Sequence, residues 1–285
     1  MTDLATAIYA FTVGACIGSF LNVCVARWPL ELSVIRPRSR CPRCAHEIAW
    51  YDNIPMVSWL VLRGRCRGCA LPISAQYPVV EFLVALGWLA AVVTFGPTFE
   101  ALRVAVLGTT LFGIALTDAK HYLIPDGFTV FGLIWVLATS VAGYVMGETS
   151  VFASPYDAFV GACVGAGAIS IVGWLGEVML KREAMGFGDV TLMAVVGAAL
   201  GPPRTFFTVF VGALLGAVAF LVIVYPIVRL RANRSAEQME LLAGHVRPEM
   251  PQIPFGVFLA PAALVALLWG QPLIDWYLRR ALLVP

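Results

Sequence analysis

The sequence predicts an all-α polytopic membrane protein with about eight transmembrane helices and one small loop domain. Of the 285 residues, 60% are hydrophobic and 13% are charged, and the mean hydropathy is +0.86. A soluble domain carries about 25% charged residues. A globule of this size exposes a large surface to water, and a chain this apolar has too few polar residues to cover that surface. Composition therefore excludes an ordinary cytosolic enzyme, a secreted disulfide scaffold and a disordered chain. The net charge of +2 gives no argument for a nucleic-acid partner.

A series of apolar runs is the second observation behind this fold class. Most of the runs approach the roughly 20 residues that a helix needs to cross a bilayer. The first run is preceded by Asp3 and by no basic residue, so we expect it to stay on the protein and not to be cleaved as a signal peptide. The run at 188–201 is short and ends in Gly201-Pro202-Pro203, so it could be tilted or partly re-entrant. The eight runs are residues 4–26, 78–97, 100–117, 123–146, 156–180, 188–201, 204–228 and 254–276.

The distribution of Lys and Arg predicts the orientation of these helices. With the N-terminus outside, 15 of the 19 basic residues fall in the loops that would be cytoplasmic. Arg279 and Arg280 at the C-terminal end would lie outside and so oppose this orientation, but the 15 basic residues of the cytoplasmic loops outnumber them. We therefore expect a multi-pass protein with the lipid bilayer as a partner. The cytoplasmic loops would be residues 27–77, 118–122, 181–189 and 229–253, the last of them a solvated connector without an assigned role.

Residues 27–77 form the only long polar stretch, and they contain two C-x-x-C pairs separated by 21 residues. This spacing matches a four-thiolate zinc ribbon. Disulfides are not expected in a reducing cytoplasm, and a loop of about fifty residues has too small a core to fold without such a clip. A reduced loop with incidental thiols and a redox pair stay open as alternatives, as does His46 in place of one thiolate. The expected ligands of a structural zinc ion are Cys41, Cys44, Cys66 and Cys69.

Two aspartates lie at the ends of apolar runs, where charges are rare enough to suggest a function. Asp118 closes the third run, and Asp189 opens the sixth within the sequence Gly186-Phe187-Gly188-Asp189. The predicted topology puts both at the cytoplasmic face of the membrane, at similar depth. Two carboxylates held close together can share a proton, so that one acts as a base on a water molecule and the other as an acid. Gly186 and Gly188 would let the chain lie close to an extended substrate.

Each of these acids also has a structural interpretation. Asp189 could cap its helix and Asp118 could mark a membrane boundary, although their shared depth favours a common role. Asp126 follows Pro125 at the start of the fourth run, so we expect it to cap that helix and not to act in catalysis. Glu81 lies inside the second run near its cytoplasmic end. We expect it to pair with an arginine of the 27–77 loop or to form a structural hydrogen bond.

Six motifs occur together in a characteristic order. They are Gly18-Ser19-Phe20-Leu21-Asn22-Val23 with Arg27, the two C-x-x-C pairs, Tyr77-Pro78-Val79-Val80-Glu81, the stretch from Asp118 to Asp126, Gly186-Phe187-Gly188-Asp189, and Pro254-Phe255-Gly256. No single motif is specific, but their order and spacing from about residue 14 to about residue 262 are. In these features the chain resembles the bifunctional prepilin leader peptidases of type IV pilus and type II secretion systems.

The resemblance implies an aspartic endopeptidase of the G-x-G-D type in the cytoplasmic (inner) membrane, with Asp118 and Asp189 as its catalytic pair. Such an enzyme removes the short basic leader of a prepilin or pseudopilin at the cytoplasmic face. The resemblance also implies methylation of the new N-terminal residue from S-adenosylmethionine, an activity associated with the cysteine-containing region. No G-x-G-x-x-G element follows a strand, so the methyl-donor site is unknown, and Glu81 is assigned to it by resemblance only.

We therefore expect three parts in the chain. Residues 1–26 form the first transmembrane helix, 27–77 the zinc loop associated with methylation, and 78–285 a transmembrane aspartic peptidase bundle. Three alternatives stay open: a G-x-G-D protease that cuts within helices, a transporter whose paired carboxylates bind ions, and a membrane scaffold with a zinc module. The cysteine loop and the boundary position of Asp118 disfavour the first. The lack of a convincing internal repeat disfavours the second.

Overall fold

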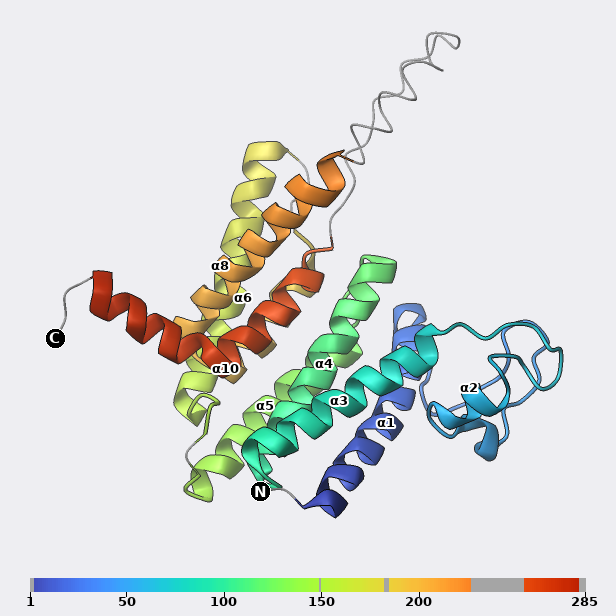
Figure 1. Ribbon diagram of the computed structural model, residues 1–285. Helices are drawn as coiled ribbons and strands as arrows, with labels where there is room; N and C mark the ends of the chain where they lie inside the picture. The colour runs from blue at the N-terminus through green and yellow to red at the C-terminus, as the bar shows by residue number, and fades with distance from the viewer. Residues whose placement is uncertain (1–2, 149, 182–184, 227–253, 282–285) are drawn as a thin grey trace, which may run out of the picture.

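The computed structural model is a bundle of apolar helices with a small loop domain beside it (Figure 1). It describes residues 3–148, 150–181, 185–226 and 254–281. Within these residues the regular structure is helical, and only isolated β-bridges occur. The elements are α1 (Leu4–Arg27), η1 (Trp28–Leu30), η2 (Trp50–Asn53), α2 (Val57–Val61), α3 (Gln76–Phe95), α4 (Phe99–His121), α5 (Asp126–Val145), α6 (Pro155–Leu180), α7 (Phe187–Leu200), α8 (Pro202–Ala219), the π-helical turn η3 (Phe220–Val224) and α10 (Gly256–Ala281).

Each of the eight apolar runs forms a helix, which confirms the predicted fold class. In the described part of the chain, seven helices are long and apolar enough to span a membrane: α1, α3, α4, α5, α6, α8 and α10. The eighth, α7, has 14 residues, which corresponds to about 21 Å against a hydrocarbon core of about 30 Å. The short run at 188–201 is therefore a short helix, as its length predicted. The predicted connector at 229–253 lies outside the described residues.

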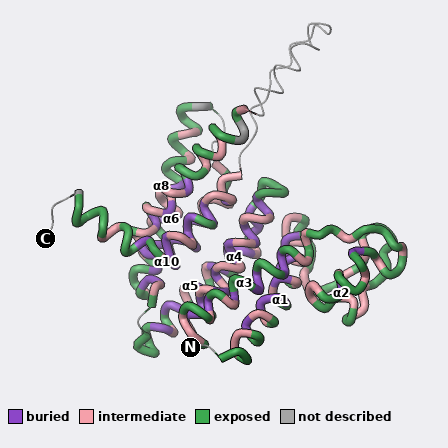
Figure 2. The backbone as a smooth tube through the Cα atoms, in the orientation of Figure 1, coloured by how far each residue is buried: buried purple, intermediate pink, exposed green. Residues whose placement is uncertain are grey.

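Successive helices of the bundle, the short α7 included, run in opposite directions, so the bundle has two ends. We call residues 27–77 the cysteine loop, and we call the end where this loop joins α1 to α3 the loop end. The C-terminus of α4 lies at the loop end, where Lys120 Nζ donates a hydrogen bond to Gln76 Oε1. The starts of α5, α7 and α10 follow at the same end. Buried residues follow the facing sides of the helices, and the outward sides are exposed, as Figure 2 shows.

Glycines allow two pairs of helices to approach closely. A Cβ on Gly14 or Gly18 of α1 would lie 2.8 Å from backbone atoms of α3. A Cβ on Gly161 of α6 or on Gly197 of α7 would collide with the backbone of the other helix. Small residues at helix contacts are the usual means of packing inside a bilayer, where van der Waals contact replaces the hydrophobic effect. This close contact leaves most of the second half of α7 buried.

A buried polar cluster ties the helices together at the end opposite the loop. Arg103 of α4 is 1% exposed, and its Nη1 donates to Ser150 Oγ at 2.7 Å and lies 3.5 Å from Glu100 Oε2. The other Glu100 oxygen accepts the Val151 N–H at 2.7 Å, and Arg204 of α8 donates to the Val151 carbonyl at 2.5 Å. The segment between α5 and α6 is thereby joined to α4 on one side and to α8 on the other.

Glu100→Ala is expected to lower the stability of the folded protein by about 3–5 kcal/mol, because it leaves Arg103 buried without its charged partner. Glu177→Ala is the matched control, since it removes an exposed carboxylate from α6 and should change stability by less than about 0.5 kcal/mol. Reversible denaturation of both variants in detergent measures the difference. Equal stability of the two variants would show that the Glu100–Arg103 pair does not hold this end together.

Candidate active site and metal centre

Asp118 lies in the last turn of α4, and only 5% of its surface is exposed. The helix ends at Tyr122, which has a left-handed φ of 53° and donates its N–H to the Asp118 carbonyl at 2.9 Å. The Asp118 carboxylate itself accepts the N–H of Val257, from the first turn of α10, at its Oδ2 with a distance of 3.2 Å. A segment 139 residues later in the chain therefore holds this carboxylate in place.

Asp189 lies in the first turn of α7. Gly186 is the N-cap of this helix, with extended backbone angles of φ −76° and ψ 153°, and its carbonyl accepts the Asp189 N–H at 3.1 Å. The N-cap interpretation of Asp189 is therefore wrong, because Gly186 occupies that position. The side chain of Asp189 is left for another role.

The two aspartates meet around Ile124, which lies between α4 and α5. A Cβ on Gly188 would lie 2.8 Å from Ile124 Cβ, and a Cβ on Gly256 would lie 3.1 Å from Ile124 Cδ1 and 2.8 Å from Asp118 Oδ2. Gly188, which directly precedes Asp189, and Gly256, which contacts the Asp118 carboxylate, therefore pack on the same isoleucine. The structure thus brings together the two acids that the sequence placed at one depth.

Gly256 is a site residue to which sequence analysis assigned no role. It belongs to the Pro254-Phe255-Gly256 motif, and a glycine two residues after a proline, at the start of the last apolar run, was the available signal. Its missing Cβ leaves room for the Asp118 carboxylate. Gly188 is required for its contact with Ile124, whereas a Cβ on Gly186 would meet only Asp189 Oδ2, at 4.0 Å. A role of Gly186 and Gly188 in positioning substrate stays a prediction.

The two other acids considered from sequence lie in other surroundings. Asp126 is exposed and is the first residue of α5, while Pro125 occupies the N-cap position in which we expected Asp126. Glu81 of α3 is 8% exposed, and its Oε2 accepts the N–H of Met56 in the cysteine loop at 2.7 Å. Of the two roles expected for Glu81, the structural hydrogen bond is the one observed. Nearby, Asn22 Oδ1 is buried and has no hydrogen-bond partner among the described residues.

The four predicted metal ligands form a compact cluster in the cysteine loop. Their sulfur atoms all lie within 4.8 Å of one another, and the Cys41–Cys69 and Cys44–Cys66 sulfur pairs are each 3.9 Å apart. Zinc–sulfur bonds of about 2.3 Å in a tetrahedron place sulfurs about 3.8 Å apart, so the cluster fits a zinc ion. His46 is not part of this cluster.

The two cysteine pairs are held in turns of the same kind. The Cys41 carbonyl accepts the Ala45 N–H at 2.9 Å, and the Cys66 carbonyl accepts the Ala70 N–H at the same distance. Both alanines have left-handed φ angles, 57° and 56°. Hydrogen bonds from backbone N–H groups, that of Cys44 first, lower the pKa of the Cys41 thiol to about 6. Backbone hydrogen bonding thus favours the thiolate at Cys41, whereas desolvation and the neighbouring thiols raise the pKa of the Cys44 thiol to about 11.

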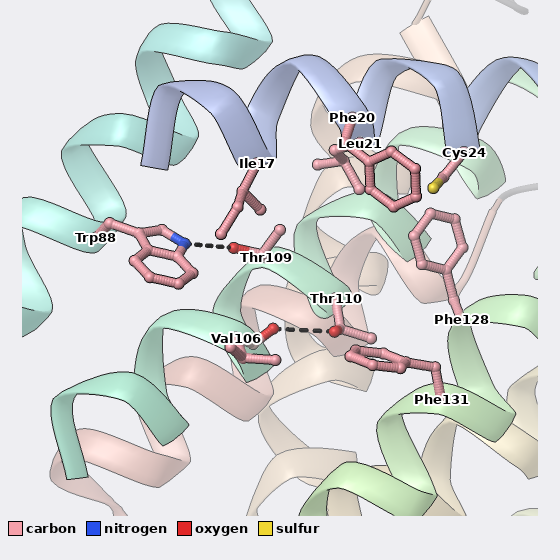
Figure 3. A pocket seen from close by; sticks show the side chains of 10 residues that line it. All are labelled: Ile17, Phe20, Leu21, Cys24, Trp88, Val106, Thr109, Thr110, Phe128 and Phe131. Atoms are coloured by element: carbon pink, nitrogen blue, oxygen red, sulfur yellow. Dashed lines mark hydrogen bonds between the residues drawn. The ribbon is translucent and has the colours of Figure 1, made fainter. Parts of the chain in front are cut away.

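A cavity of about 170 Å³ lies among α1, α3, α4 and α5 (Figure 3). It is lined by apolar side chains and by two threonines whose hydroxyls already have partners. Thr109 Oγ1 accepts from Trp88 Nε1 at 3.0 Å, and Thr110 Oγ1 donates to the Val106 carbonyl at 2.9 Å. Neither Asp118 nor Asp189 lines this cavity.

Comparison with known proteins places this geometry in a family. Residues 12–95 match the bacterial peptidase A24 N-terminal domain, and residues 105–221 match the type IV leader peptidase family. The first match spans α1, the cysteine loop and α3. The second includes both Asp118 and Asp189. No solved structure matches the chain.

Several relatives carry the name prepilin leader peptidase/N-methyltransferase. The protein from Aeromonas hydrophila is 33% identical over 296 residues, which cover 95% of this chain and 93% of that protein. The protein from Stutzerimonas stutzeri is 34% identical over 303 residues, covering 98% and 96%. The protein from Myxococcus xanthus is 44% identical over 194 residues, which are 68% of this chain but 56% of that protein. The chain therefore belongs to the type IV leader peptidase family, as its motifs predicted.

Proposed function

We propose that the protein is a membrane aspartic endopeptidase that removes the leader of type IV prepilins or pseudopilins and then methylates the new N-terminal residue. The observation that carries this proposal is the packing of Gly188, which precedes Asp189, and of Gly256, which contacts Asp118, on the same residue, Ile124, at the loop end of the bundle. The names of the relatives support both activities.

In the proposed mechanism, Asp118 and Asp189 act as one acid–base pair. One carboxylate takes a proton from a bound water as that water attacks the scissile carbonyl, while the other, protonated, donates a hydrogen bond to the carbonyl oxygen. The proton is then passed to the amine that leaves. The hydrogen bond from Val257 keeps the Asp118 carboxylate directed at the site. The extended backbone at Gly186 gives an extended substrate a segment to lie along.

The proposed topology places the loop end in the cytoplasm, at the face of the inner membrane. The cysteine loop supports this orientation, because residues 27–77 contain eight arginines and three acids. A prepilin whose apolar helix lies in the bilayer, and whose basic leader stays in the cytoplasm, would present its cleavage site at the same level as the two aspartates. Prepilins or pseudopilins are thus the proposed protein substrates.

We propose that the cysteine loop, residues 27–77, is held by one structural zinc ion and contributes to methylation. The compact sulfur cluster supports zinc. S-adenosylmethionine, when bound, would supply an electrophilic methyl group for the new amine. Asn22 and Glu81 lie where α1, α3 and the loop meet, and the unpartnered Asn22 oxygen could accept a hydrogen bond from an amine or ammonium group. We therefore assign Asn22 and Glu81 to the site that binds the methyl donor or the new amine. We assign residues 78–285 to the peptidase bundle that follows the first helix and the cysteine loop.

Asp118→Asn and Asp189→Asn are each expected to reduce cleavage of a leader-bearing pilin peptide by about 10²–10⁴-fold, because each removes one partner in proton transfer. Asp126→Asn is the matched control, since Asp126 is exposed and lies outside the pair, and it should cleave normally. Mass spectrometry of the products in detergent measures cleavage and methylation together. Near-normal cleavage by Asp118→Asn would remove that residue from the mechanism.

Gly256→Ala is expected to slow cleavage by about 10²-fold, because its Cβ would displace the Asp118 carboxylate and a shift of about 1 Å at a reacting group has such an effect. Gly216→Ala in α8 is the control, since its Cβ would make only an ordinary contact, 3.6 Å from Phe258. The rates are compared at equal, folded enzyme concentration. Normal cleavage by Gly256→Ala would contradict a tight fit around Asp118.

Cys41→Ser is expected to lose the zinc ion and to make the cysteine loop sensitive to protease, because a metal ion that binds only the folded loop stabilises it. Cys163→Ser is the control, since this exposed thiol lies in α6, outside the cluster. Elemental analysis of the gently purified protein should give one zinc per chain for the wild type and the control. A zinc content near zero in the wild type would refute the structural metal.

A further inference from the structure

The short helix α2 turns its apolar side outward. Val57, Leu60 and Val61 share one face by their spacing and are 52%, 66% and 70% exposed. The other face points into the cysteine loop: Ser58 is buried, and Trp59 Nε1 donates to a loop carbonyl at 3.2 Å. A surface helix of a soluble protein turns its apolar face inward and its polar face toward water, so the faces of α2 are reversed. No described residue covers the outward face.

An exposed aromatic pair lies beside α2. Trp50 and Tyr51 of η2 are 74% and 50% exposed, and their rings meet edge to face with centroids 5.7 Å apart. Ser58 of α2 donates its hydroxyl hydrogen to the Tyr51 carbonyl at 2.9 Å, which fixes η2 against α2. Tryptophan and tyrosine are the residues that membrane proteins place at the level of the lipid headgroups. The composition of this surface is therefore that of a membrane interface.

The same loop carries a large excess of positive charge. Eight arginines and three acids give residues 27–77 a formal charge of +5, which becomes +3 if four thiolates hold one Zn²⁺. Asp52 is bound by Arg67 in a bidentate pair, and hydrogen bonding to that arginine lowers the pKa of the Asp52 carboxyl. Arg63 and Arg65, directly after α2, are exposed and form no ion pair with any residue that the structure describes.

The loop lies beside the ends of two membrane-spanning helices. Figure 1 shows the loop extending sideways from the ends of α1 and α3, away from α8 and α10. Figure 2 shows most of the α2 region as exposed. Both ends of the loop continue directly into membrane-spanning helices. A domain that leaves the bundle sideways at the helix ends is in a position to lie along the headgroup layer.

We propose that α2 and the Trp50–Tyr51 pair dock onto the anionic surface of the bilayer that the protein itself spans. The apolar face of α2 would enter the boundary between headgroups and acyl chains, and the unpaired arginines would bind lipid phosphates. A basic pilin leader is a poor partner for this surface, because both carry positive charge. Docking would hold the cysteine loop against the membrane at the loop end of the bundle. This proposal does not depend on the proposed enzymatic activity.

The test uses the full-length protein with Leu60→Trp, reconstituted into vesicles whose lipids are brominated near the glycerol end of the acyl chains. The introduced indole should be quenched beyond the level of the wild type in an equal mixture of phosphatidylcholine and phosphatidylglycerol, and less in phosphatidylcholine alone. Val61→Trp serves as a second probe if Leu60→Trp does not fold. Absence of excess quenching for a folded probe variant in both membranes would overturn the proposal.

Charge variants separate the lipid surface from other partners. Combining the probe with Arg63→Gln and Arg65→Gln should shift the docking equilibrium about fivefold for each arginine lost. Arg279→Gln with Arg280→Gln, at the opposite end of the bundle, is the matched control and should leave the quenching unchanged. Equal quenching in both membranes and in both double variants would overturn the role of anionic lipid. Release of the quenching by saturating pilin peptide would assign the surface to the protein substrate instead and would also overturn the proposal.

Discussion

The contact between the end of α4 and the start of α10 is the constraint on which the proposed active site depends. A buried carboxylate is costly unless hydrogen bonds compensate for the water it has lost. Asp118 receives such a bond from the Val257 N–H at 3.2 Å, and the absence of a side chain on Gly256 makes the approach possible. With Asp118 held in this way, the position of α7 determines how closely Asp189 approaches it.

The position of α7 is set from two directions. Along its length, α7 packs on α6 through glycines such as Gly197. At the end far from the loop, its Ala199 carbonyl accepts the Ala153 N–H at 2.9 Å. The segment that contains Ala153 is also bound by Glu100 of α4. The helices that carry the two aspartates are therefore tied to one segment at one end and present their carboxylates at the other.

Much of this arrangement could be predicted from sequence, because hydropathy and motif spacing are local properties. The apolar runs, the short α7, the cysteine cluster and the common end of Asp118 and Asp189 were all predicted in this way. The contact of Gly256 with Asp118 joins residues far apart in sequence, so no local pattern revealed it. The burial of Arg103 depends on tertiary partners, so the sequence did not reveal it. The outward face of α2 became visible only once the loop core, with Trp59 inside, was known.

The most direct test of the central claim is the separation of the Asp118 and Asp189 carboxyl groups in an experimental structure of the enzyme with an uncleaved pilin peptide bound. The account predicts a separation of about 3–7 Å, with the scissile carbonyl or one water molecule within hydrogen-bond reach of both. Carboxyl groups at opposite faces of the membrane would contradict it. So would carboxyl groups that one water cannot bridge while the peptide is in place.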